Sequence, residues 1–482
     1  MLWLCISLPQ LPLEALRAHD DETPTVVTAC EGSTRWVICC NEPAERSNLK
    51  VAMNYTVALS IHPQVQALER KPQAEQSALE RLAAWAYQFS STVVLGEIPQ
   101  ELRHARTTAL WMEIGASLKL FGGFRHLVEH LERELEQLHY TYRLGIAPTL
   151  EGAALLARAE IRVAITTPHA LYTRIRALPI SKLALASDIL HQLHTAGVLT
   201  IGLLIELPRA AVAKRFGPEI GNFLDRLTGE AADPRPAFRL PDKYDVNFEF
   251  DFEIRSTEAL LFPLRRLLRE FAGFLRARDT GVQHFTLALT HRDLAATQLR
   301  IGLSMADRNA DIFFALAREQ LERVELSAPT VQLRLSADQF AAPSALQADW
   351  LSGALQQSEK LSHTIDRIAA RLGRERIHSL RSVADHRPES CWRAAALDEV
   401  GTEPDTYIEF PDRPLWLLPE PKPLQLSALP QITSGPERIE SGWWDTGDVQ
   451  RDYYVVRTTT GADLWVFRNL ADSGWYLHGF WS

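Results

Sequence analysis

Hydrophobic and polar positions follow different periods along the chain, and the first 140 residues mix strand and helix patterns. Residues 2–6 form an apolar run of strand length that Pro9 ends, and residues 12–16 predict a helix with proline in its first turn. A strand ending in a glycine turn follows at 109–123, and a helix over 124–138. This mixture predicts an α/β layer arrangement.

From residue 146 the pattern changes twice. Residues 146–235 carry short helical periods punctuated by Gly197, Pro208 and Gly217, and a polar linker follows at 229–243. Strand and helix periods then alternate, and Ser256 is a candidate helix cap. The predicted elements are a strand over 246–254, a helix over 256–278, strands over 282–291 and 297–304, a helix over 310–324 and a strand over 330–336. This β-α-β-β-α-β order predicts a four-stranded sheet with helices on one face.

Regular patterns become sparse after residue 336. One helix is predicted over 352–373, and the proline-rich stretch 410–424 is either a rigid spacer or a docking strip. The last fifty residues are strand-like and aromatic. They predict a small β module. At least half of its aromatic residues are expected to form the core of the module, and the alternative for them is a docking face.

Composition narrows the class of protein. The chain has 482 residues, more than one ordinary core, so about two to four domains are expected. A net charge of -9 argues against a grip on nucleic acid over the whole surface, although a local basic face is compatible with it. Five cysteines without a CxxC pair fit a reducing cytosol. No basic segment precedes the first apolar run and no stretch is long enough to span a bilayer, so we expect a cytoplasmic protein.

Two smaller signals favour structural roles. His126 and His130 lie four apart on one helix face, a zinc-binding spacing, but no third ligand is evident and an exposed helix face is the simpler interpretation. Cys39 and Cys40 are adjacent in an apolar run and predict small buried side chains of a strand. We expect no metal and no cofactor.

The order of these pieces resembles the Y-family (translesion) DNA polymerases. The phrases WAYQFS, LWMEIGASLKLFGG, LGIAPTLEGAALLARA, LPRAAVAKRFG and the tail GPERIESGWW…RDYYVV…LWVFR…WYLHGFW are more similar to the ImuB proteins, Y-family-like members of bacterial mutasomes. The resemblance implies an α/β palm and fingers over 1–145, a helical thumb over 146–237 and a split-βαβ little finger over 243–336. A linker and partner-binding segment over 337–435 and an aromatic β module over 436–482 would follow.

The resemblance also implies a function. ImuB-like proteins are non-catalytic scaffolds that bring an error-prone DnaE-type polymerase and an ImuA-like protein to the sliding clamp during damage-induced mutagenesis. Two alternatives remain open for this chain. One is an active translesion polymerase with unusual metal ligands, such as Glu14 and Glu113. The other is a plain damaged-DNA-binding protein without clamp contact.

The residues at the metal-binding positions favour the non-catalytic alternative. A Y-family polymerase needs three carboxylates to hold two magnesium ions. Aligning the family pattern on Glu14 places Cys5 at the first acid, Ser7 at the next acidic position and Gln10 at the aromatic ribose gate. Thr108 and Ala109 then stand where the adjacent Asp and Glu are needed, while Glu113 matches a structural acid. None of the replacements supplies an anionic oxygen pair.

The fingers agree with this interpretation. The positions of the Tyr and Arg that meet the incoming triphosphate correspond to Glu42 and Glu45, which would repel a polyphosphate. Arg158 matches a basic position that meets the phosphates, but one cation is not enough.

Contacts to DNA are expected in two places. Gly197 lies where a helix-hairpin-helix turn would offer N–H groups to a phosphate, although a simple αα-hairpin with a glycine cap is the alternative. In the little finger, alternation assigns one set of polar residues to the open face of the sheet: His284, Thr286, Gln298, Arg300, Gln332 and Arg334. The first strand places acids on the same side, at Glu249, Asp251 and Glu253. The arginines 265, 266, 269, 276 and 278 lie on a helix behind the sheet and predict a solvated helix face. We therefore expect weak, salt-sensitive binding.

Clamp-binding peptides have a glutamine, then two variable residues and then two large apolar residues. Gln347, Trp350 and Leu351 have that spacing, at the place where the ImuB family carries its clamp motif. A second match is Gln425, Leu426 and Leu429.

Overall fold

The computed structural model describes residues 1–16, 22–99, 106–183, 185–292, 294–326, 328–342, 354–396, 413–424, 431–444 and 447–481. The chain forms two compact units, residues 1–371 and 372–482, and each is described by itself. The mixed α/β multidomain fold with an additional C-terminal β sheet confirms the expected fold class. Among the described helices, none is long and apolar enough to cross a membrane.

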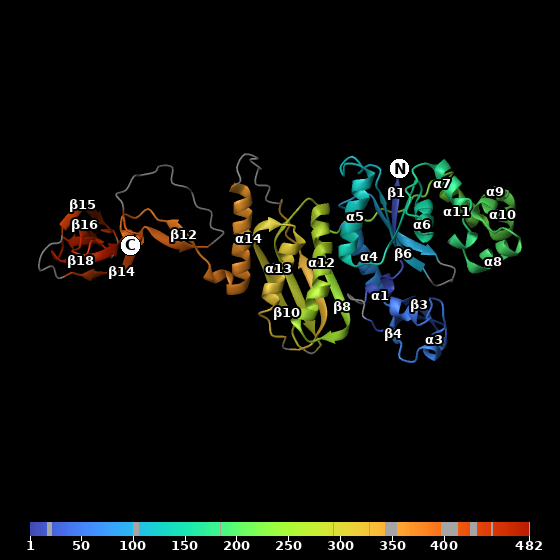
Figure 1. The fold of residues 1–482 in the computed structure, drawn as a ribbon, viewed down its shortest axis with the longest axis horizontal. Coiled ribbons are helices and arrows are strands. Elements are labelled where there is room, and N and C mark those ends of the chain that lie inside the picture. The colour runs from blue at the N-terminus through green and yellow to red at the C-terminus, as the bar shows by residue number, and fades with distance from the viewer. Residues whose placement is uncertain are drawn as a thin grey trace. The chain divides into compact units, whose positions relative to one another are not determined.

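The first unit begins with an antiparallel sheet in the strand order β5-β6-β1-β7. Its strands are β1 (Trp3–Leu8), β5 (Val93–Pro99), β6 (Arg106–Glu113) and β7 (Arg143–Ala147). Leu4, Ile6 and Met112 are buried on one face against α4 (Pro72–Ala86) and α5 (Phe124–Leu138). Cys5 and Trp111 are buried on the other face against α6 (Leu150–Arg158). The sheet is therefore covered on both faces (Figure 1).

A small second sheet and a helical region flank this one. The sheet has the order β3-β2-β4, with β2 (Thr25–Glu31), β3 (Thr34–Cys40) and β4 (Gln66–Glu69), and carries α1 (Leu11–Glu14), α2 (Glu42–Arg46) and α3 (Tyr55–Ile61). Cys39 and Cys40 are buried in β3 as predicted, and burial raises the pKa of the Cys40 thiol to about 12. The helical region contains α7 (Pro168–Ile175), α8 (Ser187–Thr195), α9 (Ile201–Glu206), α10 (Arg209–Phe216) and α11 (Pro218–Thr228).

The predicted β-α-β-β-α-β order is confirmed in the segment that follows. Its elements are β8 (Tyr244–Ile254), α12 (Thr257–Ala277), β9 (Val282–His291), β10 (Thr297–Asp307), α13 (Ala310–Leu321) and β11 (Thr330–Ala337). The sheet order is β10-β9-β11-β8. Ser256 is the cap of α12, because its hydroxyl oxygen accepts a hydrogen bond from the Ala259 N–H.

The arginines of α12 correct one sequence-based prediction. They lie mostly in an interface with α4 and α5 rather than on a solvated helix face. Arg266 is 3% exposed, and its guanidinium lies 3.8 Å from the ring centre of Tyr140. Arg276 donates to Gln88 and to the Glu134 carboxylate, and Arg269 donates to the carbonyl oxygen of Gln137. The prediction holds for Arg265, which is exposed, and was wrong for Arg266, Arg269 and Arg276. The reason is that α12 is covered on two sides, by its own sheet and by two helices that are distant in sequence.

The last helix and the second unit complete the chain. Helix α14 (Ala354–Leu372) confirms the predicted helix. The second unit has a hairpin of β12 (Ser379–Ser382) and β13 (Trp392–Ala395) and a sheet in the order β14-β18-β17-β16-β15. The sheet strands are β14 (Trp416–Pro423), β15 (Gln431–Ser441), β16 (Val449–Arg457), β17 (Asp463–Asn469) and β18 (Trp475–Phe480).

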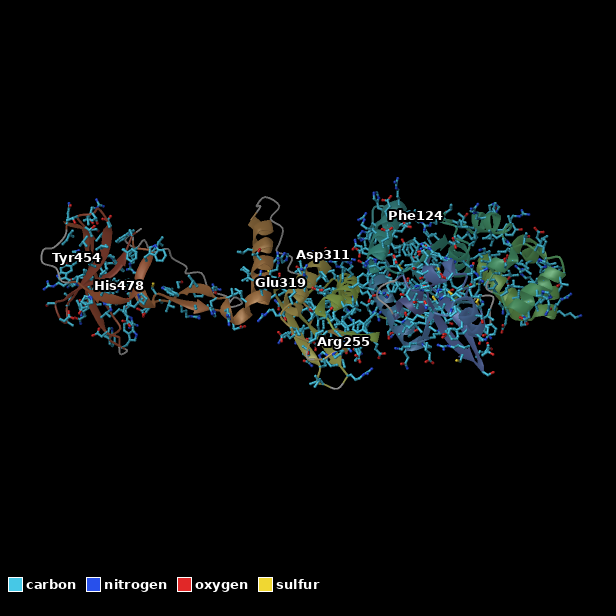
Figure 2. The ribbon with its side chains drawn as sticks, turned by 60° about the horizontal axis from the view of Figure 1, so that its bottom comes forward. Phe124, Arg255, Asp311, Glu319, Tyr454 and His478 are labelled. Atoms are coloured by element: carbon cyan, nitrogen blue, oxygen red, sulfur yellow. The ribbon has the colours of Figure 1, made fainter. Side chains whose placement is uncertain are left out.

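The aromatic residues of this sheet divide between core and surface. Tyr453, Trp465 and Phe467 are buried, whereas Trp443 and Trp444 are exposed. His478 is also buried, with its Nδ1 2.7 Å from the Tyr453 hydroxyl, and burial lowers the pKa of its imidazole to about 4 (Figure 2).

Candidate functional site

Strands β1 and β6 bring three of the four predicted metal-ligand positions to one face of the sheet. Ser7 pairs with Ala109 and Cys5 pairs with Trp111, so Cys5, Ser7 and Ala109 share one face of the sheet, while Thr108 faces the other side beside Leu8. All four side chains are buried. Burial raises the pKa of the Cys5 thiol far above its usual range, so the thiol stays neutral. This set offers no carboxylate to a magnesium ion, which prefers carboxylate oxygens.

Helix α6 is packed closely on the face that carries Cys5. Gly145 of β7 pairs with Cys5, and a Cβ atom at Gly145 would lie 2.1 Å from the carbonyl oxygen of Ala153 in α6. Trp111 donates from its indole N–H to the Leu150 carbonyl oxygen at 3.0 Å. The Arg235 guanidinium lies 4.9 Å from the ring centre of Trp111. The surroundings of Cys5 thus combine apolar and aromatic packing with one ion pair, that of Arg235 and Glu151 at 2.7 Å.

Thr108 instead lines a cleft of about 870 Å³ on the opposite face. The cleft lies between the start of α4 and strands β5 and β6, and Arg70, Glu75 and Glu97 also line it. The Arg70 guanidinium and the Glu75 carboxylate form an ion pair there at 2.7 Å. Thr108 is thus separated by the sheet from Cys5, Ser7 and Ala109.

The competing polymerase hypothesis uses Glu14 and Glu113, and the carboxylates of both accept hydrogen bonds from backbone N–H groups. The Glu113 carboxylate accepts hydrogen bonds from the N–H groups of Leu2, Gly115 and Ala116, at 2.9 to 3.2 Å. These contacts confirm the structural role predicted for it. The Glu14 carboxylate accepts from the Thr141 N–H at 2.7 Å. In the described part of the chain, no group of three or more His, Cys, Asp or Glu side chains is arranged to hold a metal ion.

The positions taken from the family pattern for the triphosphate contacts lie on two helices, Glu42 and Glu45 on α2 and Arg158 at the end of α6. Glu42 and Glu45 are exposed on α2, and Glu42 pairs with Arg46 of the same helix. Arg158 donates to the carbonyl oxygen of Leu183 at 3.2 Å. His130 packs against the rings of Phe89 and Phe121, which accounts for it without a metal.

The open face of the second large sheet gathers the predicted DNA-contacting residues. Gln298 and Arg300 are exposed on β10, where they pair with Ala288 and Thr286 of β9. On β11, Arg334 is exposed and Gln332 is half-buried. His284 of β9 is half-buried and pairs with Gly302. The alternation pattern therefore placed these side chains on one face.

An acid that the sequence analysis did not single out neutralises one of these cations. Asp245 of β8 accepts two hydrogen bonds from Arg334, Nε to Oδ1 at 2.7 Å and Nη2 to Oδ2 at 2.5 Å. This pairing raises the pKa of the Arg334 guanidinium, so the charge is retained but directed at a carboxylate. Glu253 forms longer ion pairs, with Arg255 at 3.3 Å and with Arg292 at 3.2 Å. The face is mixed in charge, which fits weak phosphate binding.

Replacing Asp245 by asparagine is expected to release Arg334 for a phosphate. We expect several-fold tighter binding of duplex DNA at low salt, and a plot of log affinity against log salt steeper by up to about 0.9. Asp242→Asn is the matched control. It removes the same charge from a carboxylate that pairs with Arg278 and not with Arg334. Fluorescence anisotropy with labelled DNA at several salt concentrations measures both quantities. Equal slopes for the two variants would exclude a role for Arg334.

Gly197 lies in the turn between α8 and α9 with a φ of 79°. Its N–H donates to the His194 carbonyl oxygen at 3.0 Å, and the Val198 N–H donates to the Leu193 carbonyl oxygen at 2.9 Å. These bonds form a glycine cap at the end of α8 and leave the Gly197 N–H occupied. The geometry matches the αα-hairpin alternative, and a DNA contact at this turn stays a prediction.

The predicted clamp peptides lie outside the described residues. This applies to Gln347, Trp350 and Leu351, and to Gln425, Leu426 and Leu429.

Comparison with known proteins gives a family assignment for part of the chain and a likeness for most of it. Residues 13–158 match the model of the impB/mucB/samB family. The chain is 28% identical over 460 residues to protein ImuB of Caulobacter vibrioides strain NA1000, which covers 88% of this chain and 97% of that protein. Protein ImuB of strain ATCC 19089 has the same values.

Two solved structures are similar to the chain at low identity. The crystal structure of DinB from Sulfolobus solfataricus is 15% identical, with a TM-score of 0.39, and covers 71% of this chain and 100% of that chain. An insertion ternary complex of Dbh DNA polymerase is 14% identical, with a TM-score of 0.41, and covers 70% and 98%. The sequence comparisons show that this chain is similar to the ImuB proteins over most of its length.

Proposed function

We propose that this chain is a non-catalytic Y-family polymerase homologue that acts as a scaffold in damage-induced mutagenesis. It links the sliding clamp, an error-prone DnaE-type polymerase and an ImuA-like protein at damaged DNA. One observation carries the proposal: Cys5, Ser7, Thr108 and Ala109, the residues that the resemblance aligns with the magnesium ligands, are all buried and have no carboxylate. Similarity to ImuB over 88% of the chain supports the choice of partners.

The polymerase alternative requires other acids to replace the missing ones. Glu14 and Glu113 are the candidates, and both carboxylates are held by backbone N–H groups of different segments. A pair of magnesium ions needs carboxylates that converge on one point. The contacts of these two acids disfavour that arrangement.

Primer extension tests the catalytic half of the proposal. Purified protein, magnesium, a primed template and all four nucleotides are expected to give no extension. An active translesion polymerase under the same conditions shows that the substrate is competent. Extension that survives purification to homogeneity would mean that the metal ligands lie elsewhere, and it would overturn the proposal.

A pull-down on the organism's sliding clamp tests the scaffold half. The Trp350→Ala/Leu351→Ala variant is expected to lose clamp binding by at least tenfold, because the two side chains would fill the apolar pocket of the clamp. The matched control is Leu426→Ala/Leu429→Ala, in the second candidate peptide. Loss in the control alone would move the site to that peptide. Clamp binding by neither wild type nor variants would favour a plain damaged-DNA-binding protein.

A further inference from the structure

Helix α14 exposes an apolar stripe to solvent. Leu361, Ile368 and Leu372 are 61%, 43% and 51% exposed, and Ile365 is half-buried between them. Spacings of four, three and four residues place these side chains on one face of the helix. We call Leu361, Ile365, Ile368 and Leu372 the α14 stripe. A surface helix normally turns such a face toward the core, so this orientation is inverted.

Polar contacts on the opposite side hold α14 in this orientation. The Asp366 carboxylate is 3% exposed and accepts a hydrogen bond from the Ser304 N–H at 2.8 Å. Ser304 belongs to β10, which is an edge strand of its sheet. Arg323 donates to the Ala370 carbonyl oxygen at 3.2 Å, and His363 lies 3.1 Å from the Asp307 carboxylate. Turning the stripe inward would break these contacts and bare an edge N–H group.

Positive charge flanks the α14 stripe on one side. Arg367 and Arg371 are exposed there. The Arg367 side chain is 65% exposed and lies 3.8 Å from the Glu319 carboxylate of α13, a long and solvent-accessible pair. Glu319 is labelled in Figure 2. A partner that covers the stripe therefore meets apolar side chains and then cations, and acidic groups complement that rim.

We propose that the α14 stripe is a docking surface for a protein partner with an apolar groove and an acidic rim. Anchors at i, i+4, i+7 and i+11 are the pattern by which a groove reads one face of a helix. The inference rests on the proposed scaffold function and assigns it a surface separate from the predicted clamp peptides.

A second copy of this chain fits the surface poorly. The stripe is about 16 Å long and about 10 Å wide, so stripe-to-stripe contact covers roughly 200 Å² per copy, against about 800 Å² per partner in a stable interface. It would also bring Arg367 and Arg371 near the same arginines of the other copy. A groove adds walls on both sides of the helix and places acids next to the cations.

The experiment compares two charge-inserting double variants of the full chain. Leu361→Glu/Ile368→Glu alters the stripe, and Val163→Glu/Leu294→Glu is the matched control at two other exposed apolar residues. Each protein is titrated by biolayer interferometry against the purified DnaE-type polymerase, the ImuA-like protein and the sliding clamp. We expect binding to one of the first two partners to weaken at least tenfold for the stripe variant only, with clamp binding unchanged.

A second variant tests the inference even if the first variant folds poorly. Arg367→Glu/Arg371→Glu leaves the apolar residues in place and is expected to weaken the same partner several-fold, with a reduced dependence on salt. Unchanged binding in both variants would overturn the inference and leave the proposed function standing. Absence of binding by the wild type to both partners would overturn the two together. A wild-type dimer that the stripe variant loses in sedimentation would assign the surface to a second copy and overturn the inference.

Discussion

Replacing Glu270 by glutamine is expected to destabilise the first unit by about 3–5 kcal/mol. Glu270 is fully buried in α12, and its carboxylate accepts from Arg81 of α4 at 2.7 Å and from the Tyr140 hydroxyl at 2.9 Å. A second guanidinium, that of Arg266, lies 3.4 Å from the same carboxylate. Burial raises the pKa of the Tyr140 hydroxyl to about 12, so Tyr140 adds no charge. Glutamine would leave two buried cations without an anion.

Urea unfolding followed by tryptophan fluorescence measures this loss. Hydrogen exchange of α4 and α12 localises it, because a chain of several domains need not unfold in one step. Glu129→Gln is the control, since Glu129 pairs with Arg125 on the exposed side of α5 and is expected to leave the midpoint unchanged. A shift no larger than that of the control would mean that the buried cluster does not hold α12 to α4.

Replacing Gly145 by alanine is expected to cost about 3 kcal/mol, at the upper end of overpacking effects. The added Cβ atom would lie 2.1 Å from the Ala153 carbonyl oxygen and 2.3 Å from the Ala157 nitrogen. Both are backbone atoms of α6, so no side chain can turn aside, and the helix must move away from β7. The soluble yield and the thermal midpoint are expected to fall together.

Gly221 provides the opposite case within the same unit. It lies in α11, and a Cβ atom there meets no atom within 4 Å. Gly221→Ala is expected to stabilise the chain by about 0.4–1 kcal/mol, because it reduces the freedom of the unfolded chain. A stabilising Gly145→Ala would show that α6 does not lie against the face that carries Cys5.

The sheet of β8, β9, β10 and β11 was predictable because its elements carry their own signals. Strict alternation marks β8, β9 and β10, and Ser256 marks the start of α12. The same alternation placed Gln298, Arg300, Gln332 and Arg334 on one face. Periodicity predicts which face of a strand a residue occupies, and that is sufficient to group these four side chains on one face of the sheet.

Partners across distant segments were not predictable from the sequence. The Arg334–Asp245 pair depends on the register between β8 and β11, because the two residues lie 89 positions apart in the sequence. The contacts of the α12 arginines depend on the packing of α4 and α5 against this helix. The sequence pattern of a helix predicts only which of its faces is polar and which is apolar. Arg266 counts as polar in such a pattern, although it is buried over the ring of Tyr140.

Two described neighbours of the predicted clamp peptide are tied to the same sheet. Before the peptide in sequence, Ala341 and Gly281 exchange two backbone hydrogen bonds at 2.8 and 3.0 Å, and after it α14 is held to β10 through Asp366. A clamp captured at Trp350 and Leu351 would therefore be attached to this sheet from both sides along the chain. Such a two-sided attachment raises the effective concentration of the sheet at the DNA that the clamp encircles.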